Sequence, residues 1–348
     1  MCTGETLSFD RVLITGASGS LGQQLIYEMA RRGIRPIAMV RPGSNTTYID
    51  SLGLEKRFAD LRNEQELAKT VAGVDAIIHT AAWVNFRQDR MTQFAGINIF
   101  GAVNLYRAAA AAGVRRFVHI SSVAAIGAIP RQGKRSTTPV EPMTEAFPFN
   151  LDHLRIPYIL TKHAAEVELG KLAAESGPEL VIVNPSIIVA PSRTGDDRSK
   201  AQKRFRFGVL PKVHNYLNLT DIRDVAPAIV AALEQGRPGE RYILAGENIR
   251  ATDLVMTASV LLGLKPLMVT VPRPLLMLAA QMTTTWKRFT GRSKQSFYPD
   301  LVRMLDYDWA WDSSKAKHDL GFSPRPLRQT LADILGNDFN GTWMRPRT

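Results

Sequence analysis

Tyr158 and Lys162 are the two residues whose types and spacing suggest catalysis most directly. Four positions separate them, so a helix beginning near Pro157 places the phenol and the ammonium on one face. The unperturbed phenol has a pKa of about 10, and a nearby positive charge favours its phenolate, which aids proton transfer at neutral pH. None of the other seven tyrosines has a lysine at that offset. The pair predicts an acid/base group, although the bare pattern is not specific.

Two hydroxyl side chains, Ser121 and Ser122, end an expected strand that begins at Phe117. Residues at the carboxyl ends of parallel strands face the crevice in which ligands bind. A serine hydroxyl there can hold a substrate carbonyl oxygen while Tyr158 protonates it. Serines also cap ordinary strand ends, so these two indicate a catalytic role only in combination with the tyrosine–lysine pair and a cofactor-binding turn.

A glycine-rich turn follows the first expected strand, residues 12–14, and leads into an expected helix over 21–32 that stops at Gly33. Glycine lets the backbone approach a pyrophosphate, and the helix N-terminus offers free N–H groups to it. Glycines also serve structural turns, but a position between a strand and a helix favours a dinucleotide site. The turn residues expected to bind the cofactor are Gly16, Ser18, Gly19, Ser20, Leu21 and Gly22.

Arg41 follows the second expected strand, residues 36–40, where such folds meet the adenosine ribose. An acid at this place binds the 2′-hydroxyl, whereas an arginine accommodates a 2′-phosphate. No acid precedes Arg41, so the sequence favours NADP(H), with NAD(H) as the alternative if Arg41 is only a solvated loop charge. Asp60, after the third strand, is placed either to accept a hydrogen bond from the adenine amino group or to cap a loop.

Short apolar runs alternate with helix-patterned stretches through the first half of the chain, which indicates βαβ units and a parallel sheet. We expect an α/β fold, a Rossmann doubly wound parallel sheet with a smaller C-terminal α/β substrate-binding lobe. Residues 1–190 are expected to form the NAD(P)-binding domain. Residues 191–348 are expected to form mainly the lobe, with segments near 215–245 returning to the sheet.

The composition of the chain limits the cellular compartments and the binding partners that we expect. The single cysteine, Cys2, excludes an intrachain disulfide and a multi-cysteine metal site, and we expect no metal. The first ten residues lack the build of a secretory signal, so a cytoplasmic location is expected by default. The formal charge of +12 suits nucleic acid or an anionic membrane. However, the chain has no recognisable nucleic-acid module, and enzymes that bind phosphorylated cofactors carry such charge too.

Two later segments leave alternatives open. Residues 274–282 are apolar but too short to span a bilayer, and Trp286, Lys287 and Arg288 follow them. A helix there either packs on the small lobe or rests on a membrane surface.

Residues 191–212 carry seven basic side chains and two acidic ones. We expect this stretch to cover the substrate pocket, and its charge either binds a phosphate or lipid headgroup or is simply solvated.

Together these features resemble the extended short-chain dehydrogenase/reductase family, which includes nucleotide-sugar epimerases, dihydroflavonol reductases and 3β-hydroxysteroid dehydrogenases. The resemblance covers nearly the whole chain. Beyond the glycine turn and the tyrosine–lysine pair, it is carried by Asp60-Leu61, His79-Thr80-Ala81-Ala82, Asn98, Ser121-Ser122, Asn184-Pro185-Ser186, the segment 221–226 and the segment 315–322.

The resemblance implies roles for the matching residues. Ser122, Tyr158 and Lys162 would be the catalytic set, and Asn98 would hold the active-site helix or a water. Besides the glycine turn, Arg41 and Asp60, the implied cofactor contacts are Leu61, Thr80, Ala81, Ala82, Tyr158, Lys162, Pro185 and Ser186. The implied chemistry is hydride transfer to or from a secondary alcohol carbon, with Tyr158 moving the proton.

Two departures from the sugar-nucleotide members bear on the substrate. The chain has Ala125-Ile126-Gly127 where they usually carry Val-Tyr-Gly, and Asn184-Pro185 where they carry Arg-Pro. These differences favour the dihydroflavonol reductase and hydroxysteroid dehydrogenase branch, and therefore an NADP(H)-dependent oxidoreductase acting on a small apolar or lipid-like ketone or alcohol. The alternatives are a nucleotide-sugar epimerase or dehydratase with tightly bound NAD, and a cofactor-sensing protein without chemistry. The resemblance also implies a homodimer.

Overall fold

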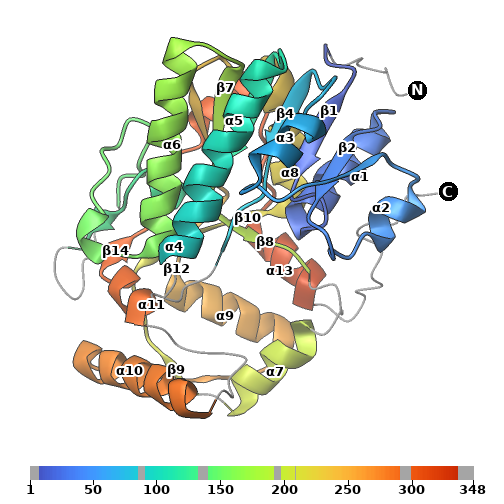
Figure 1. Cartoon of the computed structure of the whole chain (residues 1–348). Coiled ribbons are helices and arrows are strands. Elements are labelled where there is room, and N and C mark those ends of the chain that lie inside the picture. Colours follow the sequence, from blue (N-terminus) through green and yellow to red (C-terminus); the bar gives the residue numbers. More distant parts are fainter. Residues whose placement is uncertain are drawn as a thin grey trace.

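Seven short strands form one parallel sheet at the centre of the structure (Figure 1). The computed structural model describes residues 8–84, 91–131, 140–191, 197–207, 209–290 and 299–335. The order in the sheet is β11-β7-β5-β4-β1-β2-β3. The strands are β1 Val12–Thr15, β2 Ile37–Val40, β3 Lys56–Phe58, β4 Ala76–His79, β5 Arg116–Ile120, β7 Glu179–Pro185 and β11 Arg241–Leu244.

This strand order makes the sheet doubly wound. From β1 the chain proceeds through β2 to β3 in one direction, and from β4 through β5 and β7 to β11 in the other. The two directions separate at the neighbouring strands β1 and β4, and a ligand crevice is expected above their carboxyl ends. The predicted fold class is confirmed. Every residue of β1, β2, β4 and β5 is buried, as expected for parallel strands covered on both faces.

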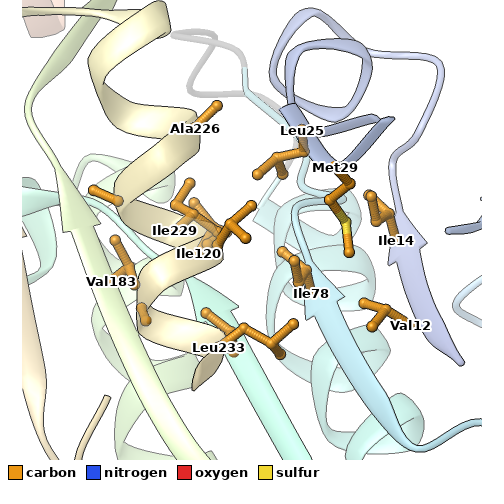
Figure 2. Close-up of a cluster of buried hydrophobic side chains, with 14 of the residues drawn as sticks. Val12, Ile14, Leu25, Met29, Ile78, Ile120, Val183, Ala226, Ile229 and Leu233 are labelled. Atoms are coloured by element: carbon orange, nitrogen blue, oxygen red, sulfur yellow. The ribbon is translucent and has the colours of Figure 1, made fainter. Parts of the chain in front are cut away.

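One face of the sheet is covered by α1 Ser20–Arg31, α2 Thr47–Ser51, α8 Ile222–Gln235 and α12 Ser314–Leu320. Figure 2 shows the core beneath α1 and α8, where Leu25 and Met29 of α1 approach Ile229 and Leu233 of α8. The apolar face predicted for the first helix is thus the face that packs on the sheet. The helix ends at Arg31, and Gly33 has a φ of 77°, a conformation that favours glycine.

The opposite face is covered by α3 Glu64–Thr70, α5 Gly101–Ala111 and α6 Pro157–Glu175. Leu105 and Tyr106 of α5 pack beside Phe117 and Leu169, and the Tyr106 hydroxyl donates to the Pro178 carbonyl at 2.7 Å. Helix α5 continues directly from α4 Met91–Phe94 and a π-helical segment, η2 Ala95–Phe100. Short 3₁₀ turns, η3 Val123–Ala125 and η4 Asp152–Leu154, lie between β5 and α6.

Elements outside the central sheet form the smaller part of the molecule. Its helices are α7 Asp197–Phe207, α9 Ala251–Leu262, α10 Arg273–Thr290, α11 Pro299–Met304 and α13 Leu327–Leu335. Its strand β10 Tyr216–Asp221 pairs with β8 Ile187–Val189 on one side and with β12 Glu247–Arg250 on the other. Two further pairs are β9 Val209–Pro211 with β13 Leu267–Val269 and β6 Ile129–Pro130 with β14 Tyr307–Asp308. Helices α7, α9 and α10 gather at the lower end of Figure 1.

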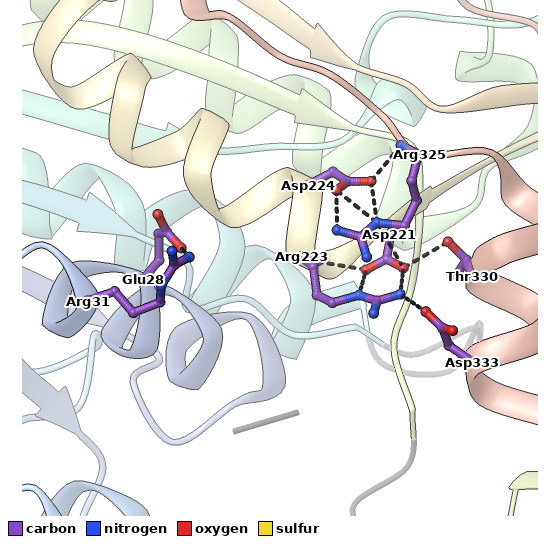
Figure 3. A network of polar contacts seen from close by, with 8 residues as sticks. All are labelled: Glu28, Arg31, Asp221, Arg223, Asp224, Arg325, Thr330 and Asp333. Carbon is purple, nitrogen blue, oxygen red and sulfur yellow. Dashed lines mark hydrogen bonds and ion pairs between the residues drawn. The ribbon is translucent and has the colours of Figure 1, made fainter. Parts of the chain in front are cut away.

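A polar network joins the C-terminal helix α13 to the start of α8 (Figure 3). Asp221 caps α8 by accepting from the Arg223 N–H at 2.8 Å, and it also accepts from the Thr330 hydroxyl of α13 at 2.8 Å. Arg223 reaches Asp333 of α13 at 2.6 Å. Because the Asp221 side chain is fully buried and accepts four hydrogen bonds from Arg223 and Thr330, this network fixes α13 against the start of α8.

Several predicted features fall outside the described part of the chain. In the basic stretch 191–212, the structure does not describe residues 192–196 and residue 208. The side chains of Arg198, Arg204 and Arg206 also lie outside the description. The side chains of Trp286, Lys287 and Arg288 are also outside it. Among the residues that are described, no helix is both long and apolar enough to cross a bilayer.

Candidate active site

A cavity of about 340 Å³ opens at the carboxyl ends of β1, β2 and β4, where the strand order reverses. Each cofactor residue predicted from the glycine turn through Ala82 lines it. The lining residues are Gly16, Ser18, Gly19, Ser20, Leu21, Gly22, Met39, Val40, Arg41, Ser44, Ala59, Asp60, Leu61, Thr80, Ala81, Ala82, Trp83 and Ile97. The other predicted contacts, Tyr158, Lys162, Pro185 and Ser186, are not part of this lining.

The glycine turn is packed so closely that no side chain fits at Gly16 or Gly22. Gly16 has a φ of 66°, and a Cβ there would lie 2.7 Å from the Thr80 hydroxyl and 2.9 Å from the Ala81 nitrogen. A Cβ on Gly22 would collide with the Gly16 carbonyl oxygen. The Gly19 N–H donates to that same carbonyl at 2.9 Å and closes the turn. The start of α1 therefore presents backbone N–H groups to the cavity, which suits a pyrophosphate.

Thr15 and His79 connect the two strands that flank the crevice. The Thr15 hydroxyl lies 2.8 Å from His79 Nδ1 and accepts from the Ala81 N–H at 3.2 Å. The Thr80 hydroxyl donates to the Thr15 carbonyl at 2.7 Å. Burial, with Lys162 adding to it, lowers the pKa of His79 to about 3, so its imidazole is neutral. These bonds hold the ends of β1 and β4 together and fix the cavity wall.

Arg41 and Asp60 lie at the part of the cavity beside β2 and β3. Arg41 is exposed, and no ion pair to it occurs among the residues that the structure describes. The Asp60 carboxylate instead pairs with Arg62 at 2.6 Å. That hydrogen bond is the main reason why the pKa of Asp60 falls to about 2. Asp60 is therefore ionised and already engaged, whereas Arg41 can meet a ligand anion.

Ser122, Tyr158 and Lys162 are brought together between the end of β5 and the first turns of α6. Pro157 is the first residue of α6, where its missing N–H costs no helical hydrogen bond. Because the helix begins there, Tyr158 and Lys162 both lie in it, on successive turns. The Lys162 ammonium donates to the Ile120 carbonyl at 2.8 Å. Burial lowers the pKa of Lys162 to about 8, and Glu166 opposes that decrease.

Tyr158 behaves differently from the expectation based on spacing. Burial raises the pKa of its phenol, and a hydrogen bond with the Ser122 hydroxyl opposes the increase. The expectation that Lys162 would govern this pKa overlooked burial, which favours the neutral phenol. A neutral phenol is the form that can give a proton to a developing alkoxide.

Glu166 and Asn184 lie next to the predicted catalytic residues, and the sequence indicated neither of their contacts. Glu166 follows Lys162 by one further helical turn and is buried. The Asn184 side-chain amide donates to Glu166 at 2.6 Å and to the Ser122 carbonyl at 2.9 Å. Arg241 lies 3.6 Å from the same carboxylate. The spacing Tyr158, Lys162, Glu166 was a usable signal, because it places all three on one helix face.

Asn98 lies on the π-helical segment η2 and holds two other parts of the site. Its side chain accepts from the Trp83 N–H at 2.7 Å and donates to the Trp83 carbonyl at 3.1 Å. It also donates to the Thr161 hydroxyl of α6 at 3.2 Å. Asn98 thus joins the cavity-lining segment after β4 to the helix that carries Tyr158. Trp83, a lining residue missed from sequence, follows the predicted Ala82 directly.

Pro185 and Ser186 lie at the end of β7. The Ser186 N–H donates to the Leu244 carbonyl at 3.1 Å, and its buried hydroxyl has no hydrogen-bond partner among the described residues. Ile187 follows and is exposed. The first residues after β7 therefore offer an unused hydroxyl and an apolar side chain, while Ser122 and Tyr158 come from the neighbouring β5 and from α6.

Comparison with known proteins agrees with this geometry. The profile described as "NAD dependent epimerase/dehydratase family" matches residues 12–245, from β1 through β11. The chain belongs to this family of NAD(P)-dependent enzymes. The match covers the sheet, the glycine turn and the helix of Tyr158, so the family and the enzyme class are those that the sequence resembled.

Relatives of this epimerase/dehydratase family member extend over nearly its full length. A candidate dihydroflavonol 4-reductase of Synechocystis sp. is 31% identical and aligns with 94% of this chain and 94% of its own. "Sterol demethylase protein B" of Methylococcus capsulatus is 29% identical over 96% of this chain and 98% of its own. The crystal structure of gox2253 is 32% identical with a TM-score of 0.75, covering 94% of this chain and 97% of that one.

Proposed function

We propose that this enzyme is an NADP(H)-dependent oxidoreductase that reduces a ketone, or oxidises the corresponding secondary alcohol, on a small apolar substrate. The observation that carries the proposal is the joint position of Ser122, Tyr158 and Lys162. Ser122 follows the carboxyl end of β5, and Tyr158 and Lys162 lie on the first turns of α6. Asn98 connects α6 to the cavity-lining Trp83, so the three side chains stand beside the cavity in which a dinucleotide would bind. The names of the two curated relatives, a reductase and a protein of sterol demethylation, fit reduction of an apolar compound.

The cavity fits a nicotinamide dinucleotide. Gly16, Gly19 and Gly22 would receive the pyrophosphate, because they line the cavity in the turn between β1 and α1, where the N-terminus of the helix offers backbone N–H groups. Arg41 would meet a 2′-phosphate, because it is exposed at the cavity edge and no acid of the described residues pairs with it. When bound, the nicotinamide supplies or takes up a hydride.

The chain's own residues then handle the proton and the orientation. Ser122 would hold the substrate carbonyl oxygen, and the neutral Tyr158 phenol would donate its proton to that oxygen as the alcohol forms. The resulting phenolate is stabilised by the Lys162 ammonium, whose remaining N–H donors would also bind ribose hydroxyls. In the oxidative direction Tyr158 would take the proton back. Asn98 and Asn184 keep these side chains in place.

The substrate is proposed to be apolar because apolar side chains stand next to the site. Val84 follows the cavity-lining Trp83, Ile187 follows Ser186, and both side chains are more than half exposed. Exposed aliphatic side chains beside a catalytic group suit a hydrocarbon surface better than a sugar nucleotide, which offers hydroxyls and phosphates.

The test is NADPH oxidation with a panel of cyclic and long-chain ketones, comparing wild type with Tyr158→Phe. The variant keeps the ring and loses only the hydroxyl, so NADPH binding should persist while turnover falls by about 10²–10⁴-fold. Turnover of nucleotide sugars, with no net change in a cofactor that copurifies with the protein, would instead establish an epimerase or dehydratase. Undiminished ketone reduction by Tyr158→Phe would remove Tyr158 from the mechanism.

A further inference from the structure

The exposed large apolar side chains are concentrated in one part of the chain. Among the described residues, half of them fall between residues 256 and 282, on α9, β13 and α10. They are Met256, Val260, Leu267, Leu275, Leu278 and Met282. Scattered exposed apolar side chains are normal, but such a concentration marks an interaction surface.

Helix α10 carries the most regular part of this surface. Leu275, Leu278 and Met282 are spaced three and four residues apart, so they lie along one face, and each is more than half exposed. Ala280, on another side of the helix, is fully buried. The helix therefore directs an apolar stripe away from the protein, which is the reverse of ordinary core packing.

The sequence of this region is strongly basic. No Asp or Glu occurs in residues 254–299, which contain six Lys or Arg, and none occurs in residues 198–220, which also contain six. These two segments together carry twelve positive charges, equal to the net charge of +12 of the whole chain. Of the cations in these segments whose side chains the structure describes, Lys200, Lys203, Lys212, Lys265 and Arg273 are exposed, and Arg273 forms an ion pair with Asp306.

The described parts of the two acid-free segments meet in the fold. Strand β9 of the first pairs in parallel with β13 of the second, and the Lys212 N–H donates to the Val269 carbonyl at 2.8 Å. Helix α7 packs on α9. Figure 1 places α7, β9, α9 and α10 together at one end of the molecule. This end of the molecule, which we call the basic apolar face, carries the apolar stripe of α10 and the exposed side chains of Lys200, Lys203, Lys212 and Lys265.

We propose that the basic apolar face binds the surface of an anionic lipid bilayer, with α10 lying in the plane of the interface. An apolar stripe bordered by lysines and arginines is what an interfacial helix requires, because the stripe enters the acyl boundary while the cations meet anionic headgroups. Nucleic acid would use the charge but leave Leu275, Leu278 and Met282 in water. A second copy of this chain would bring like charges together.

The experiment is co-sedimentation of the full chain with vesicles of phosphatidylcholine alone and of phosphatidylcholine mixed with phosphatidylglycerol. We expect binding to the mixed vesicles that weakens as salt is added, because headgroup attraction is screened. Leu278→Asp should lower the partition coefficient by about tenfold or more, since it loses one buried leucine and adds a repelled charge. Val167→Asp, at an exposed position on α6, is the matched control and should bind like wild type.

Other outcomes would overturn the proposal. Equal binding by Leu278→Asp and wild type, or no preference for the anionic vesicles, would show that the face does not bind membranes. If Leu278→Asp changes the mass measured by light scattering without vesicles, the face is an interface between copies. Salt-sensitive DNA binding that Leu278→Asp leaves unchanged, without vesicle binding, would assign the charge to nucleic acid. NADPH binding should be the same in Leu278→Asp and Val167→Asp, which separates this test from that of the proposed function.

Discussion

Replacing Lys162 by methionine is expected to stabilise the protein while it abolishes activity. The ammonium is buried, and burial lowers its pKa from 10.5 to about 8. One pKa unit corresponds to about 1.4 kcal/mol, so keeping this lysine charged in the folded protein costs about 3 kcal/mol relative to the unfolded chain. Methionine keeps most of the volume, but it loses the bond to the Ile120 carbonyl, which costs about 1 kcal/mol. The net expected gain is about 2 kcal/mol.

The pH dependence follows from the direction of this shift. Below pH 8, Lys162 is charged in both the folded and the unfolded state, and the full cost is present. Between about pH 8 and 10.5 the unfolded chain binds more protons, so the wild type gains stability as the pH rises. The stability advantage of Lys162→Met should therefore shrink over this range. At pH 10.5 the variant should be less stable than the wild type by about the contribution of the lost hydrogen bond, about 1 kcal/mol.

Urea unfolding of both proteins, followed by tryptophan fluorescence at pH 7 and at pH 10, measures this difference directly. The difference between the two proteins removes the contribution of the other lysines, which they share. Two results would show that the buried ammonium does not destabilise the folded protein. One is a variant less stable than wild type at pH 7, and the other is a difference in the free energy of unfolding that does not shrink toward pH 10.

Three further substitutions test the core and the site. Leu25→Ala, in the core of Figure 2, should cost about 2–5 kcal/mol, because the side chain is fully buried; a loss below about 1 kcal/mol in a thermal melt would contradict that packing. Gly16→Ala should weaken NADPH binding by about tenfold or more, since the new Cβ would approach the Thr80 hydroxyl at 2.7 Å, and unchanged affinity would disprove the close cradle. Asn98→Ala should lower kcat by about tenfold or more with little effect on KM, because Trp83 and the active-site helix lose their shared partner; a change confined to KM would assign Asn98 to substrate binding.

Much of the fold was predictable because local signals agreed with one another. The alternation of apolar runs and helix-patterned stretches indicated a parallel sheet, and the predicted helix stop at Gly33 coincides with a left-handed φ angle of 77°. The cavity residues up to Ala82 were predictable for a related reason. They belong to segments at the carboxyl ends of neighbouring strands, so position in the βαβ pattern was sufficient to place them.

What the sequence did not reveal depends on contacts between distant segments. Asn184 was expected only as part of a motif. In the structure its side-chain amide, on β7, donates hydrogen bonds to Glu166 of α6 and to the Ser122 carbonyl after β5. Periodicity tells which face a residue occupies, but not which residue from elsewhere faces it. Likewise, spacing showed that Tyr158 and Lys162 share a helix face, but not that both are buried, and burial sets the direction of both pKa shifts.

The nicotinamide cofactor that binds at the cavity decides most directly between the proposed reductase and an epimerase. Titration of the purified protein with NADPH and separately with NADH, followed by nicotinamide fluorescence, measures this directly. We predict much tighter NADPH binding, with the preference lost in Arg41→Ala, because Arg41 is the exposed cation where the 2′-phosphate would lie. A clear preference for NADH, or NADPH affinity unchanged in Arg41→Ala, would contradict the proposed reductase.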